Sequence, residues 1–385
     1  MTTFHISRNR TTSYEVSGEF DRYILDRGVS LVTDTNSLWE KPGAFGNVFE
    51  IRALLKGDYA FLSEVVGSKL IVDDTGKVRG EDGIAMDDQA TVINRGDIDL
   101  TDQAIALTRK ATLENTGTVH ADFAVELLSG TIINRAGGTI VGDDIAITTA
   151  NAADGVVKTI NDGAIRSPVI AYDGGDYRDY LINRGSVIGD VALGGGDDVF
   201  DNLHGKFRGS LAGGEGDDIL VTASAKLFMT EEFGEGYDLV KSSVSYTLND
   251  NVDYLSLIGN RNIKGTGNDL LNQINGNAGN NVLKGLGGND WLDGGKGTDR
   301  LTGGLGDQDT FIFGTGYGHD TVTDFEDDLD RINLQDFEAV KSYADLLANH
   351  TTDTARGLLI HAGSDRLLII GMTEAQLSSI EVPFS

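Results

Sequence analysis

The sequence predicts an all-β fold, in which a right-handed parallel β-helix over about residues 66–192 continues into a second repetitive β-region over 193–313, with small caps at both ends. Three observations predict it. Short apolar runs recur every 20 to 25 residues, turns rich in Gly, Asn and Asp separate them, and helical periodicity is weak throughout. Two short β-runs cannot bury an apolar face alone, whereas coils stacked on one another can.

Residues 1–65 are the first element, and they fit the repeat poorly. They hold Trp39, Pro42 and several aromatic residues, as in the segment 44–49. A solenoid needs its open end covered. We therefore expect an N-terminal cap or irregular coils here.

The β-helix is predicted from a repeat of the form Asn-x-Gly-x-Val/Ile. Its glycines are spaced by 20, 21, 21, 25 and 22 residues, and they are Gly76, Gly96, Gly117, Gly138, Gly163 and Gly185. A second apolar run lies between them, as in Ile105-Ala-Leu107. Asparagine tolerates a left-handed turn conformation and can stack in a hydrogen-bonded ladder. We expect the turn asparagines to form such a ladder.

Composition excludes several classes of protein. The 385 residues carry 60 acidic and 31 basic side chains, a net charge of −29, so a nucleic-acid binder is excluded. Cysteine is absent, which excludes a disulfide scaffold, and 39% hydrophobic residues argue against disorder. Residues 1–20 lack the apolar segment of a signal peptide, and no stretch reaches the ~18–20 apolar residues of a membrane helix. These features alone would suggest a cytoplasmic protein.

The second repeat carries the chemistry. Residues 213–221 and 294–302 match Gly-Gly-x-Gly-x-Asp-x-U-x at every fixed position, U being a large apolar residue, and near matches surround them. The glycines allow tight turns whose carbonyls can face a ligand, the aspartate adds a charged oxygen, and U enters the core. Oxygen-only ligands select Ca²⁺ over softer metals.

These motifs resemble the RTX (repeats-in-toxin) nonapeptides of secreted bacterial proteins, which build a parallel β-roll with Ca²⁺ between stacked turns. The likeness covers about residues 190–385 and implies that several Ca²⁺ ions are held over 193–313. The expected metal-binding residues are Gly196, Asp198, Gly214, Gly216, Asp218, Gly236, Asp238, Gly267, Asp269, Gly279, Asn281, Gly288, Asp290, Gly295, Gly297, Asp299, Gly304, Gly306, Asp307 and Asp309.

Spacing predicts which turns share an ion. Asn281, Asp290 and Asp299 lie nine residues apart, half a coil, so Ca²⁺ would bridge Asn281 with Asp299 and Asp290 with Asp307 or Asp309. The earlier motif aspartates, at 198, 218 and 238, lie 20 apart, one turn per coil, and Asp179 resembles a degenerate first member. The alternative is that isolated motifs are metal-free turns.

The C-terminal segment, 314–385, is expected to cap the roll. A helix is predicted over 338–347, a hairpin from the strands 357–361 and 366–370, and a short helix over 373–379. The resemblance implies in addition an uncleaved type I secretion signal that is read by an ABC transporter. The chain is then secreted, extracellular and folded by Ca²⁺ outside the cell.

The sequence contains none of the common hydrolase motifs. His-Glu-x-x-His and Gly-x-Ser-x-Gly are absent, and the six histidines are scattered. We expect a binding, adhesion or matrix protein whose target is an extracellular polysaccharide or a cell surface. The alternative is a polysaccharide lyase or epimerase that uses the β-helix face. Its best local support is the segment 172–180, where three tyrosines accompany Asp and Arg.

Overall fold

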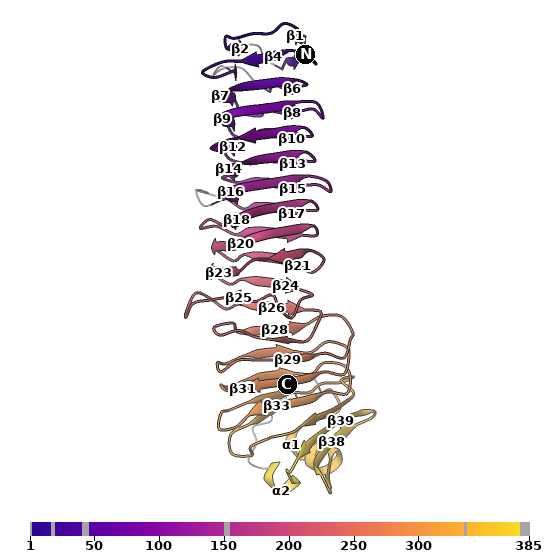
Figure 1. Cartoon of the computed structure of the whole chain (residues 1–385). Coiled ribbons are helices and arrows are strands. Elements are labelled where there is room, and N and C mark those ends of the chain that lie inside the picture. The colour runs from indigo at the N-terminus through magenta and orange to yellow at the C-terminus, as the bar shows by residue number, and fades with distance from the viewer. Residues whose placement is uncertain (1, 17–19, 41–45, 150–154, 335–336, 378–385) are drawn as a thin grey trace. The chain divides into compact units, whose positions relative to one another are not determined.

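A computed structural model describes residues 2–16, 20–40, 46–149, 155–334 and 337–377. The chain divides into two compact units, residues 1–218 (unit 1) and 219–385 (unit 2). Each is built from short parallel strands stacked coil upon coil, as Figure 1 shows. The predicted all-β parallel solenoid is confirmed. Among the described residues, no helix is long and apolar enough to cross a membrane.

Unit 1 contains two parallel sheets. The first sheet contains, in spatial order, β1 (Thr3–Ile6), β3 (Arg22–Leu25), β6 (Val48–Ile51), β8 (Lys69–Val72), β10 (Thr91–Asn94), β13 (Ala111–Asn115), β15 (Gly130–Asn134), β17 (Val157–Asn161), β19 (Asp179–Asn183) and β21 (Val199–Asn202). Strands of both sheets already occur before residue 65, and Pro42 lies outside the described residues.

The second sheet of unit 1 runs beside the first. It contains β2 (Tyr14–Val16), β4 (Ser30–Val32), β5 (Leu38–Glu40), β7 (Leu54–Ser63), β9 (Lys77–Met86), β11 (Asp97–Leu100), β12 (Gln103–Leu107), β14 (Thr118–Leu127), β16 (Thr139–Thr148), β18 (Ala164–Asp173), β20 (Ser186–Gly195), β22 (Lys206–Arg208) and β23 (Leu211–Glu215). Ten-residue strands such as β14 and β16 pair along nearly their whole length, so each coil is held in register by the next.

The core of unit 1 consists of columns of aligned side chains. Val92, Leu113 and Ile132 occupy the same position in successive strands, and all are fully buried. Burial of each such side chain contributes ~1.5–3 kcal/mol. Thr159 is the exception in this column, because it places a buried hydroxyl where its neighbours are apolar.

As predicted, stacked asparagines form a ladder at the C-terminal ends of the first-sheet strands. Each side-chain Nδ2 donates to the Oδ1 of the next asparagine, over distances of 2.7 to 2.9 Å. The members of this ladder are Asn94, Asn115, Asn134, Asn161, Asn183 and Asn202. All are almost completely buried.

Unit 2 repeats this architecture with shorter strands. One sheet contains β24 (Ile219–Thr222), β26 (Leu239–Ser242), β28 (Tyr254–Leu257), β30 (Gln273–Asn275), β32 (Trp291–Asp293), β34 (Thr310–Ile312) and β36 (Arg331–Asn333). The other contains β27 (Tyr246–Thr247), β29 (Lys264–Thr266), β31 (Val282–Leu286), β33 (Arg300–Gly304), β35 (His319–Val322), β39 (Asp365–Ile370), β38 (Gly357–Ala362) and β37 (Thr351–Thr354). β25 (Met229–Thr230) is a further short strand.

The apolar position of each nonapeptide fills the core of unit 2, as predicted. Leu292, Leu301 and Phe311 are fully buried two residues after their aspartates.

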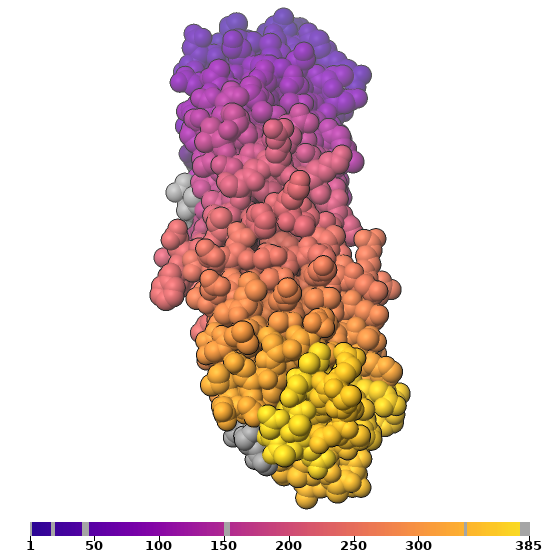
Figure 2. All heavy atoms as spheres, turned by 60° about the horizontal axis from the view of Figure 1, so that its bottom comes forward, coloured from indigo at the N-terminus to yellow at the C-terminus, as the bar shows by residue number. Residues whose placement is uncertain are grey.

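The C-terminal segment packs against the last coils of unit 2, visible as the yellow mass in Figure 2. The expected hairpin is confirmed as antiparallel β38 and β39, and β39 extends the sheet beside β35. The predicted helix over 338–347 is wrong in extent: α1 (Tyr343–Asp345) begins after Ser342, whose side chain caps it, and a π-helical turn follows (Leu346–His350). The last helix, α2, is short (Glu374–Leu377), and residues 378–385 lie outside the described part.

Candidate metal centre

Acidic residues form ladders at the N-terminal ends of the strands. In unit 1 the ladder is Asp179, Asp198 and Asp218, in successive coils. In unit 2 the corresponding ladder, here the long ladder, is Asp238, Asp253, Asn272, Asp290, Asp309 and Asp330, each directly preceding a strand of one sheet. A short ladder contains Asn281 and Asp299, which directly precede β31 and β33 of the other sheet, and Asp320, the second residue of β35.

In most aspartate rungs one carboxylate oxygen accepts a backbone N–H of the preceding rung. The Oδ1 of Asp290 accepts the backbone N–H of Asn272 at 2.8 Å, and the Oδ1 of Asp309 accepts that of Asp290 at 2.9 Å. Asp330 continues the pattern by accepting from Asp309 at 3.0 Å. The same contact joins Asp198 to Asp179 and Asp299 to Asn281, each at 2.6 Å, Asp218 to Asp198 at 2.7 Å, and Asp320 to Asp299 at 2.9 Å.

In five of these aspartates the other oxygen has no protein donor, whereas the Oδ2 of Asp330 accepts the backbone N–H of Glu326 at 2.9 Å. The buried Oδ2 atoms that lack a hydrogen-bond partner belong to Asp198, Asp290, Asp299, Asp309 and Asp320. These carboxyls are at most 2% exposed, so bulk water does not replace the missing donor. Leaving a buried acceptor unsatisfied costs ~1–3 kcal/mol, and more when the group is charged. Five orphaned oxygens in repeated positions therefore require either protons or a cation.

Burial and mutual repulsion make these groups hard to ionise without a cation. Burial raises the pKa of Asp290 to about 8, and the neighbouring charges of Asp309 and Asp307 add to the effect. Burial likewise raises the pKa of Asp198 to about 9, with repulsion from Asp218. The pKa values of Asp299 and Asp320 are both raised, again chiefly by burial. A bound cation would reverse this preference, since it stabilises the ionised form.

Glycines leave room for these oxygens. A Cβ at Gly285 would lie 1.9 Å from the Asp290 Oδ2 and 2.6 Å from the carbonyl oxygen of Gly303 in the next coil. A Cβ at Gly303 would lie 2.0 Å from the Asp309 Oδ2. Each turn thus brings a carboxylate oxygen and backbone carbonyls together around a site that excludes side chains. A donor set of hard oxygens without nitrogen or sulfur suits Ca²⁺.

The structure brings most of the expected ligands together. Asn281 lies beside Asp299, and Asp290 beside Asp309, so Asp309 occupies the ladder position that the sequence left open. Asp307 instead accepts the backbone N–H of Gly288 at 3.1 Å.

Asp269 is placed differently from the other expected ligands. Its side chain is exposed and outside the ladder, whose rung in that coil is the buried Asn272. Among the expected glycines, positive φ angles occur at Gly196, Gly214, Gly216, Gly288, Gly295, Gly297 and Gly306, and not at Gly236, Gly267, Gly279 and Gly304.

Three ladder residues were missed: Asp253 and Asp330 lack the glycines of the motif, whereas Asp320 follows Gly316 and Gly318 and lacks only the first motif glycine. Asp320 and Asp330 are buried rungs and Asp253 is a half-buried one, and none of the three was among the expected ligands. Each is followed by an apolar residue two positions later, at Leu255, Val322 and Ile332. The pattern Asp-x-U, the second half of the nonapeptide, is therefore the sequence signal that could have identified all three residues.

The tyrosine-rich segment 172–180 is only partly exposed, with Tyr177 and Arg178 at the surface. Tyr172 is fully buried, and Asp179 is buried in the unit 1 ladder, where Thr149 donates to its Oδ2 at 2.6 Å. Arg178 is paired with Asp197 at 2.6 Å. Tyr172 and Asp179 are therefore inside the coil and are not accessible to a ligand at the surface.

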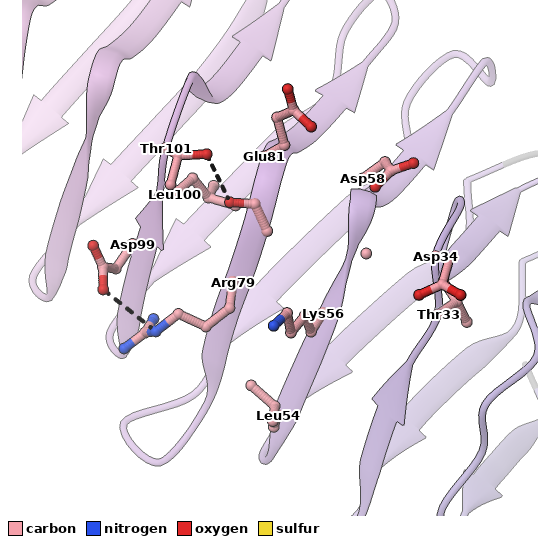
Figure 3. Close-up of a pocket in the computed structure, with 12 residues that line it drawn as sticks. Thr33, Asp34, Leu54, Lys56, Asp58, Arg79, Glu81, Asp99, Leu100 and Thr101 are labelled. Carbon is pink, nitrogen blue, oxygen red and sulfur yellow. Dashed lines mark hydrogen bonds and ion pairs between the residues drawn. The ribbon is translucent and has the colours of Figure 1, made fainter.

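The β-helix face carries a groove of about 690 Å³, shown in Figure 3. It is lined by four carboxylates, at Asp34, Asp58, Glu81 and Asp99, and by two cations, Lys56 and Arg79. Arg79 is held by Asp99 at 3.4 Å and also bonds Asp97, so its charge is already neutralised. No histidine lines this groove. Because carboxylates and cations both line it, its charge favours neither anionic nor cationic ligands.

Part of unit 2 is similar to a known family of repeats. The family model of the RTX calcium-binding nonapeptide repeat, in four copies, matches residues 275–307, which contain rungs of both unit 2 ladders. Among curated proteins no match was found. A crystal structure of the extracellular lipase LipA from Serratia marcescens is similar over 62% of this chain at 18% identity, with a TM-score of 0.24, and the match spans 41% of the lipase. Residues 275–307 thus match the RTX calcium-binding nonapeptide repeat family.

Proposed function

We propose that this protein is a secreted calcium-binding β-solenoid that is exported through a type I ABC transporter and folds on Ca²⁺ outside the cell. There it serves as a binding, adhesion or matrix protein towards an extracellular polysaccharide or a cell surface. One observation carries the proposal: the orphaned buried carboxylate oxygens of the ladders.

The aspartates of the ladders, with the carbonyls of the glycine turns, would hold the ions. Bound Ca²⁺ supplies the positive charge that the orphaned Oδ2 atoms lack. The chain's own contribution is to fix the Oδ1 atoms by backbone N–H groups, to bury the site under apolar residues, and to exclude side chains from the turns.

The energy of binding suffices to control folding. At ten times Kd each site adds RT ln 11, ~1.4 kcal/mol, and several sites add ~5 kcal/mol, comparable to the stability of a domain. Extracellular Ca²⁺ near millimolar fills sites with Kd of ~10⁻⁴–10⁻³ M, whereas cytosolic Ca²⁺ does not. With a net charge of −29, the ion-free chain is also weakened by self-repulsion.

A Ca²⁺ titration followed by far-UV circular dichroism, with Mg²⁺ as control, tests this function. The expected result is a cooperative gain of β signal with Ca²⁺ alone. Asp290→Ala should raise the Ca²⁺ midpoint, while Asp269→Ala, which removes an exposed carboxylate outside the ladder, should leave it unchanged. A chain that is fully folded in EDTA and insensitive to Ca²⁺ would refute the proposal.

A further inference from the structure

A groove of about 440 Å³ lies along one corner of unit 1, where turns of successive coils lead into β16, β18, β20 and β22. Its floor is backbone. A Cβ at Gly163 would lie 2.3 Å from the carbonyl oxygen of Gly138, and one at Gly185 would lie 2.1 Å from that of Gly163. The coils stack too closely at this corner for any side chain, and the hollow follows from that spacing.

Three cations line the groove, although the chain carries a net charge of −29. They are Arg166, Arg184 and Lys206, and all three are exposed. Arg184 lies 3.6 Å from Asp162, the single carboxylate of the lining. In the described part of the chain, neither Arg166 nor Lys206 has an ion pair. The groove of Figure 3 differs, because its arginine is neutralised by two aspartates.

The arrangement of strands extends this positive surface along the coils. Arg166 lies beside Ile188 in the next strand, and Ile188 lies beside Arg208 in the one after. Adjacent strands are ~4.8 Å apart, so Arg166 and Arg208 lie about 10 Å from each other on a line along the stacked coils, on either side of Ile188. A linear anionic ligand fits such a line better than a single compact anion does.

Two hydroxyls and one carboxylate lie among the cations. The hydroxyls of Thr139 and Ser186 and the carboxylate of Asp162 line the same groove. Guanidinium groups bind carboxylates in a bidentate manner. Hydroxyl and carboxylate oxygens can accept hydrogen bonds from sugar hydroxyls. No aromatic side chain lines the groove, so nucleobases have no stacking surface.

We infer that this groove binds a short segment of an acidic polysaccharide through the carboxylates of its uronic acid residues. The inference rests on the proposed role as an extracellular binding protein and names the ligand class and the site. Binding at this corner does not use the ladder carboxylates, so calcium-dependent folding can be measured separately.

Isothermal titration of the full chain in Ca²⁺ with a hexameric oligogalacturonate tests the inference, with neutral oligogalactose as the ligand control. The double variant Arg166→Ala/Arg184→Ala should raise Kd about tenfold or more, since each lost charge-assisted contact weakens binding. Lys158→Ala, an exposed cation outside the groove, should leave Kd unchanged. Circular dichroism in Ca²⁺ should show all variants folded.

Other outcomes would overturn the inference. Oligogalacturonate can associate with the protein through bridging Ca²⁺, and such binding would be equal in the double variant. Equal affinity for neutral oligogalactose would also contradict the ligand class. Preferential binding of single-stranded DNA or a phosphopeptide, with loss in the double variant, would assign the groove to phosphate ligands instead.

Discussion

Two ladders occupy opposite ends of the same strands in unit 1, and they solve one problem in different ways. Strand β19 begins at Asp179 in the aspartate ladder and ends at Asn183 in the asparagine ladder. An amide carries both a donor and an acceptor, so each asparagine satisfies the next. A carboxylate only accepts, so an aspartate ladder leaves an oxygen without a donor. Stacked asparagines are self-sufficient, whereas stacked aspartates need an external positive charge.

The long ladder in unit 2 contains both an asparagine rung and aspartate rungs, in adjacent coils. The Nδ2 of Asn272 donates to the carbonyl of Val252 at 3.0 Å, while the next rung, Asp290, has an orphaned Oδ2. In the short ladder the Nδ2 of Asn281 likewise donates to the carbonyl of Ile263 at 3.1 Å. Amides can therefore occupy ladder positions without a metal, and the aspartates give these positions their dependence on Ca²⁺.

The largest expected effect comes from putting a carboxylate into the amide ladder. In Asn134→Asp, the new oxygen would face the Asn161 Oδ1 and the Ala164 carbonyl, to which the native Nδ2 donates. A buried unpaired charge should lower the free energy of unfolding by ~3–5 kcal/mol, in Ca²⁺ and in EDTA alike. Urea denaturation measures it, with the exposed neighbour Ala136→Asp as control. Rescue of the variant by Ca²⁺ would contradict the comparison.

A methyl group in a calcium turn should have the next largest effect. Gly285→Ala would collide with the Asp290 carboxylate and the Gly303 carbonyl, and we expect a loss of ~2–3 kcal/mol with a raised Ca²⁺ midpoint. Gly287→Ala is the matched control, because its nearest neighbours would be 3.6 Å away. Equal Ca²⁺ midpoints for the two variants would show that the space beside Asp290 is not needed.

Replacing an aspartate of the ladder by asparagine should separate stability from calcium binding. Asp290→Asn supplies a donor where the Oδ2 has none, as the native Asn272 does. In EDTA the variant should gain ~1–2 kcal/mol of stability, while its Ca²⁺ midpoint rises because a charged ligand is lost. Thermal melts with and without Ca²⁺ check both signs. A variant that is less stable in EDTA would argue against an orphaned oxygen.

The smallest expected effect is that of pH on the metal-free chain. Burial raises the pKa of Asp290 to about 8 and that of Asp309 to about 6, from 3.8 in the unfolded chain. The stabilisation is complete below the unfolded value and is lost as pH rises through 6 to 8. In EDTA, melting temperatures should be higher at about pH 5.5 than at about pH 8.5. With Ca²⁺ the order should reverse, since protons compete with the ion.

The sequence predicted repeats better than it predicted exact rungs. Regular spacing located the asparagine ladder, because each turn repeats the same dipolar side chain at the same position. Asp269 was chosen because it follows the motif glycines, but in the fold the rung of that coil is Asn272. Registers depend on strand pairing across coils of 18 to 21 residues, which a nine-residue motif does not specify.

In unit 1, too, the sequence did not predict which side chains lie at the surface. The tyrosines of segment 172–180 indicated a surface for sugars, yet Tyr172 points into the coil. The corner groove at Arg166 and Arg184 carries no sequence motif, because it is made by glycines and cations from different coils. Only the stacking of the coils brings these residues together.

Hydrogen exchange of the full chain in Ca²⁺ and in EDTA tests the central claim most directly. The asparagine-ladder segment 91–149 should keep its protection in EDTA, while segment 282–333, with the aspartate ladders, should exchange about a hundredfold faster or more. Equal protection of both segments in EDTA, whether both are high or both are low, would contradict the account.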